Sequence, residues 1–85
     1  RAHERRLSYK ERRALEALRG ELALLPQRIE TLEGERDRLA LAMSDPSFYR
    51  GDSAGIAQAA ARVKELEDEL AGAYQRWEEL DALDF

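Results

Sequence analysis

The sequence contains no cysteine, only two prolines and one histidine, and no long apolar run. The absence of cysteine excludes a disulfide framework, a thiolate zinc site and a cysteine nucleophile. With His3 as the single histidine, we expect no transition-metal site. A helix that crosses a bilayer needs about 20 consecutive apolar residues, so we also expect no membrane span.

Aromatic residues make up only 7% of the 85 residues, whereas charged residues make up 38%. This composition is typical of long solvated helices in one small domain and poor for a globular core. The acidic residues lie at helix-surface spacing rather than in converging pairs, and no phosphate-binding glycine loop is present. We therefore expect this chain itself to be no enzyme and to carry no cofactor. Because it does not begin with Met, we expect it to be part of a longer protein.

Two stretches of the chain repeat apolar residues at steps that alternate between three and four. The first seam is Leu15, Leu18, Leu22, Leu25, Ile29, Leu32, Arg36, Leu39 and Met43. The second seam is Ile56, Ala59, Val63, Leu66, Leu70, Ala73, Trp77 and Leu80. Such a narrow apolar stripe on a helix needs a partner helix. The pattern predicts an all-α fold, an antiparallel two-helix coiled-coil hairpin.

Local signals predict the boundaries of this hairpin. Residues 1–7 are interpreted as the end of a basic linker, and 8–85 as the hairpin. Ser8 and Glu11 form a capping-box pattern that starts the first arm, about 8–44. Pro26 removes a backbone donor while the seam keeps its phase, so this helix is expected to be kinked or broken near Pro26. A turn over 45–52 leads to a second helix, about 53–83, capped by Asp52 or Ser53.

Charges that flank the seams favour one antiparallel register. It opposes Leu18 to Trp77 and Ile29 to Leu66, with the turn near Ser47 and Phe48. Its flanking pairs all have opposite signs, namely Glu21–Arg76, Arg28–Glu69, Glu35–Arg62 and Arg12–Asp81. A slide by one heptad would oppose like charges. In this register Trp77 is predicted to pack in the core, and Phe48 is predicted to fold back onto Met43 and Ile56.

The charge distribution is uneven. Residues 1–20, which we call the basic root, hold seven bases and three acids, whereas the rest of the chain holds seven bases and fifteen acids. Clustered Lys and Arg neutralise phosphates, so the root is a candidate nucleic-acid contact. The candidate residues are Arg5, Arg6, Lys10, Arg13 and Arg19, with Arg50 beside two aromatic residues at the turn as a weaker one. The alternative is a solvated face whose charges pair within the hairpin.

Four short strings occur in order: Leu-Ser-Tyr-Lys-Glu at 7–11, Leu-Pro-x-x-Ile-Glu-x-Leu-Glu at 25–33, Asp-Pro-Ser-Phe-Tyr at 45–49, and Ala-Tyr-Gln-Arg-Trp-Glu-Glu-Leu at 73–80. In these strings, from residue 7 to about 83, the chain resembles the C-terminal coiled-coil domain of the ABC-F family of ATP-binding proteins, of the Uup type. The spacing between the first two strings is longer than the family pattern by about one heptad.

The resemblance implies a soluble cytoplasmic parent with two ATP-binding cassettes that bind ATP and are absent from this chain. The domain would hang from the second cassette by a basic linker and would bind DNA or ribosomal RNA. The rival hypothesis is a structural arm or spacer that docks on the cassettes or on a protein partner. We expect a monomeric hairpin, although a domain-swapped dimer would use the same contacts.

Overall fold

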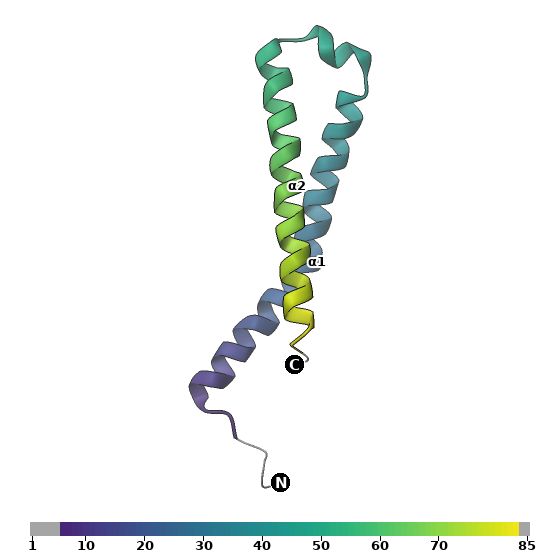
Figure 1. The fold of residues 1–85 in the computed structure, drawn as a ribbon. Helices are drawn as coiled ribbons and strands as arrows, with labels where there is room; N and C mark the ends of the chain where they lie inside the picture. Colours follow the sequence, from purple (N-terminus) through teal and green to yellow (C-terminus); the bar gives the residue numbers. More distant parts are fainter. Residues whose placement is uncertain (1–5, 84–85) are drawn as a thin grey trace.

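The computed structural model describes residues 6–83. They form helix α1 (Tyr9–Met43), a short 3-10 helix η1 (Pro46–Arg50) and helix α2 (Ser53–Asp81). Figure 1 shows α1 and α2 as two antiparallel arms that η1 joins at the tip. The molecule is a rod with extents of 71 × 17 × 14 Å. The predicted all-α hairpin is confirmed, while most of the linker over 1–7 lies outside the described residues.

Side-chain caps fix where each helix begins. The hydroxyl of Ser8 accepts from the Glu11 amide at 3.0 Å, and the Glu11 carboxylate accepts from the Ser8 amide at 2.9 Å, which confirms the capping box. Asp45 accepts from the Ser47 amide at 2.9 Å, and Asp52 caps α2. The hydrogen bond from the Ser47 amide lowers the pKa of Asp45. The chain thus reverses direction through two aspartate caps.

The core is one layer of side chains between α1 and α2. All its buried members belong to the two predicted seams: Leu25, Ile29, Leu32, Leu66, Leu70, Ala73 and Leu80. Leu66 is fully buried, and the partly buried Leu18, Leu22 and Leu39 pack against this layer. Arg36, the one charged seam residue, keeps its guanidinium at the surface and bonds Asp37 at 3.1 and 3.2 Å.

Helix α1 continues through Pro26 but is not straight. Figure 1 shows it bending in its blue part, near the point where α2 ends. Proline lacks the amide that would bond the carbonyl of Leu22, and its ring crowds the preceding turn. Beyond the bend the N-terminal turns of α1 run past the end of α2, and Leu15 there is half-buried and outside the core.

Two of the four predicted flanking pairs form. Arg62 donates to both oxygens of Glu35 at 2.7 and 2.9 Å. Arg76 donates to both oxygens of Glu21 at 2.5 and 2.9 Å. The other two predicted ion pairs, Arg28–Glu69 and Arg12–Asp81, are not formed within residues 6–83.

The predicted register is wrong near Trp77. This residue lines one groove with Pro26 and Ile29 of α1. The predicted register puts Leu66 opposite Ile29, and Trp77 lies eleven residues further along, about 16 Å at the rise of an α-helix. Helix α2 is therefore displaced toward the tip. Exposed ion pairs are individually weak, and long arginine side chains reach their carboxylates from the displaced register.

Candidate nucleic-acid interface

The first turns of α1 belong to the basic root and run past the end of α2, whereas Leu18, near the other end of the root, packs against the core layer. Residues 6–20 hold five bases and two acids, a net charge of +3. Figure 1 shows this purple and blue part of α1 leaving the hairpin axis beyond the last turn of α2. The bases therefore project around an isolated helix and not into a cleft.

The structure divides the predicted root residues between two faces. Lys10 and Arg13 lie three positions apart in α1 and share a face. The guanidinium of Arg13 lies 5.9 Å from the ring centroid of Tyr9, a cation–π contact that holds it at the first helical turn. Arg19 is nine residues after Lys10, which places it on the opposite face. Arg6 is exposed just before the helix, and the predicted Arg5 lies outside the described residues.

Arg50 belongs to a different end of the molecule. It lies at the last residue of η1, at the tip of the rod, opposite the root. Phe48 is half-buried there, and its ring meets Tyr49 edge to face at 5.1 Å. Tyr49 is exposed, and Asp45 and Asp52 flank this segment. The structure therefore does not join Arg50 to the root in one site.

Arg12 is a further candidate for phosphate contact. It is predicted to pair with Asp81, but its side chain is exposed and forms no hydrogen bond or ion pair within residues 6–83. It lies seven positions before Arg19 and shares its face. The spacing was visible in the sequence, but Arg12 becomes available only because α1 runs past α2.

Two arginines in the body of the hairpin, Arg62 and Arg76, are held by carboxylates of α1, whereas Lys10, Arg12 and Arg13 form no ion pair within residues 6–83. Hydrogen bonds from Arg62 to Glu35, more than their charge attraction, lower the pKa of Glu35 and raise that of Arg62. Hydrogen bonds from Arg76 likewise lower the pKa of Glu21, and that of Arg76 is raised. A guanidinium nitrogen of Arg76 also lies 3.6 Å from a carboxylate oxygen of Glu79. Both guanidiniums are therefore neutralised inside the fold.

No group of three or more metal-ligating side chains comes together within residues 6–83. Neither α1 nor α2 has a stretch apolar and long enough to span a bilayer.

Comparison with known proteins places the chain in a family. Residues 6–82 match the family described as "ABC transporter C-terminal domain". The chain is 36% identical over 78 residues to "ATP-binding protein Uup" of Escherichia coli (strain K12), covering 92% of this chain but 11% of that relative. No solved structure matches it. The chain therefore belongs to the ABC transporter C-terminal domain family, as the resemblance of its four short motifs implied.

Proposed function

We propose that this chain is the accessory domain of an ABC-F ATPase and binds nucleic acid through its basic root. The observation that carries the proposal is the contrast in charge pairing. Lys10, Arg12 and Arg13 project from an isolated helix end, while Arg62 and Arg76 are held by carboxylates. Arginine and lysine side chains without a carboxylate partner are available to neutralise phosphate groups.

The mechanism would be neutralisation of the phosphate backbone with little reading of base edges. Backbone contacts fix position and orientation but carry no sequence information directly. A single basic helix with side chains on two faces suits one groove edge or the ends of a structured RNA. The relative is described as ATP-binding, so ATP would bind in the cassettes and not in this domain.

The test is fluorescence anisotropy with labelled duplex DNA and with structured RNA across a salt series. Each phosphate contact contributes about 0.9 to the log–log salt slope on B-DNA. We expect the triple variant Arg6→Gln, Lys10→Gln, Arg13→Gln to bind more weakly and to lose roughly two to three from that slope. Tighter binding of duplex DNA would favour a role in DNA transactions, and tighter binding of structured RNA would favour a role at the ribosome.

A matched control removes the same charge elsewhere. Arg28→Gln, Arg38→Gln and Lys64→Gln together lie outside the root, and this triple variant should keep the parent slope. Equal loss in both triple variants would show a nonspecific charge effect. No binding of the parent chain at low salt would favour the structural arm, for which the 71 Å rod and the net charge of −4 are suited.

A further inference from the structure

An aromatic groove opens between the two helices on the root side of the hairpin. Its lining consists of Pro26, Ile29, Tyr74, Trp77 and Glu78, and its volume is about 360 Å³. Trp77 was predicted to be a core residue, but 37% of it is exposed, and Tyr74 is 45% exposed. The displaced register leaves both rings beside Pro26 and Ile29 of α1.

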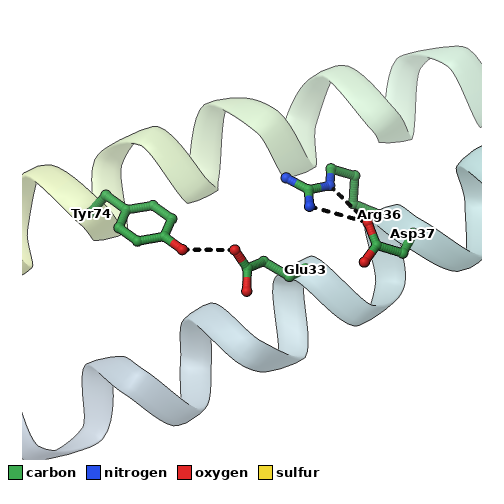
Figure 2. Close-up of polar contacts among 4 residues, drawn as sticks. All are labelled: Glu33, Arg36, Asp37 and Tyr74. Carbon is green, nitrogen blue, oxygen red and sulfur yellow. Dashed lines mark hydrogen bonds and ion pairs between the residues drawn. The ribbon is translucent and has the colours of Figure 1, made fainter.

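Tyr74, Trp77 and Glu78 carry the polar side-chain atoms of the groove lining. The hydroxyl of Tyr74 donates to Glu33 at 2.7 Å, which holds the ring in place (Figure 2). Figure 2 also shows Arg36 of α1 turned to Asp37. The carboxylate of Glu78 makes no hydrogen bond or ion pair in the described part of the chain. The groove therefore offers two aromatic faces and one uncommitted carboxylate.

This combination suits a cation on an apolar stem. Aromatic faces attract a guanidinium or an ammonium through the ring quadrupole, and a desolvated contact of this kind is stronger than one in water. Arginine fits better than lysine because its planar group stacks on rings and bonds a carboxylate through two donors. Its three methylenes would lie against Pro26 and Ile29.

We propose that the groove receives an arginine side chain from the surface of the ATP-binding part of the same polypeptide. The chain spans 11% of its relative, and its family is a C-terminal domain, so in a parent of similar length a large ATP-binding part would be tethered to it. Charge complementarity favours a basic partner, because Glu78 and Asp81 lie near the end of α2 without an ion pair in the described residues, whereas Glu79 is already paired with Arg76. If the tether were short and flexible, it would supply an effective concentration near millimolar, which lowers the affinity that docking requires. This inference rests on the family assignment and not on nucleic-acid binding.

The groove carries its own probe, because Trp77 is the only tryptophan in the sequence. The ligand is the peptide acetyl-Gly-Ala-Arg-Ala-Gly-amide at millimolar concentration, and the control peptide replaces Arg by citrulline, which is neutral and of the same shape. We expect a saturable change in Trp77 emission with the arginine peptide and none with citrulline. Glu78→Gln should weaken binding about three- to tenfold, whereas Glu67→Gln, which removes the same charge away from the groove, should not. Equal responses to both peptides, or none to either, would overturn the proposal.

The source of the arginine is tested in the full polypeptide with a photocrosslinking benzoyl-phenylalanine in place of Trp77. We expect crosslinks to a segment of the ATP-binding part that contains arginine, and their loss when that arginine is replaced by Gln. The same crosslinker at Leu41, which is 74% exposed, is the control. Crosslinks to a second copy, to another protein or to the control segment alone would refute it. DNA anisotropy of Glu78→Gln should equal that of the parent chain, so this proposal and the nucleic-acid proposal fail separately.

Discussion

The phenol of Tyr74 on α2 donates a hydrogen bond to the carboxylate of Glu33 on α1, across 41 positions of the sequence. It joins the helices on the side of the seam where the flanking ion pairs are absent. The hydrogen bond and the negative charge of Glu33 raise the pKa of Tyr74 above its ordinary value of 10.0. The contact requires the protonated phenol.

The raised pKa of Tyr74 gives an alkaline prediction. Because this pKa is higher in the folded state, the stabilisation is complete below pH 10 and is lost as the pH rises through the folded value. We expect the Tm of the parent chain to fall more steeply between pH 9 and 12 than that of Tyr74→Phe. Thermal circular dichroism checks this. Parallel curves would mean that the contact does not stabilise the hairpin.

At acid pH the stability depends on pH in the opposite direction, through Glu21 and Glu35. Arg76 and Arg62 lower the pKa of Glu21 and Glu35 below the ordinary 4.5, so their stabilisation is complete above pH 4.5 and is lost as the pH falls through the folded values. The double variant Glu21→Gln, Glu35→Gln should show a shallower loss of Tm between pH 5 and 2 than the parent. The control, Glu30→Gln with Glu67→Gln, should follow the parent curve.

The fully buried Leu66 gives a core prediction. Leu66→Ala should lower the free energy of unfolding by about 2–5 kcal/mol, because it removes buried methyl groups and leaves a cavity in a single-layer core. Leu24→Ala, at a residue 68% exposed, should change it by no more than about 0.5 kcal/mol. Urea unfolding measures both. Similar effects in the two variants would contradict the seam assignment.

Replacing Pro26 is predicted to stabilise the hairpin rather than destabilise it. It lies inside α1, where proline is about 3 kcal/mol less favourable than alanine. Pro26→Ala should therefore raise the free energy of unfolding, by an amount up to that figure, and straighten α1. Urea unfolding gives the first and small-angle X-ray scattering the second. If the variant were more stable but α1 were still bent, packing against α2 and not Pro26 would be the cause of the bend.

The periodic pattern predicted the elements of the hairpin because helix pairing depends on periodicity alone. Within residues 6–83, all buried residues fall on the two seams, from Leu25 to Leu80. The level of α2 along α1 could not be predicted in the same way, because a displacement by whole heptads keeps every seam residue facing its partner. The flanking charges could not fix this register either, because exposed ion pairs are weak. Arg76 also reaches Glu21 from the displaced position.

Errors in the candidate sites follow from that one displacement. The exposure of Trp77 and the release of Arg12 from Asp81 both depend on where α2 ends against α1. The basic root itself was visible in the sequence because clustering of charge needs no tertiary information. Its division between two faces follows from helix geometry once Ser8 is known to begin the helix.

The overhanging part of α1 has a thermodynamic consequence. Isolated helices shorter than about 12–15 residues are marginal in water because nucleation is costly. This part depends on the Ser8 cap, worth about 1 kcal/mol, and contains Gly20, around whose missing side chain nothing lies within 4 Å. Its amides should exchange with deuterium faster than those around Leu66. A ligand that binds the root would then slow this exchange, so that helix folding and binding become one coupled equilibrium.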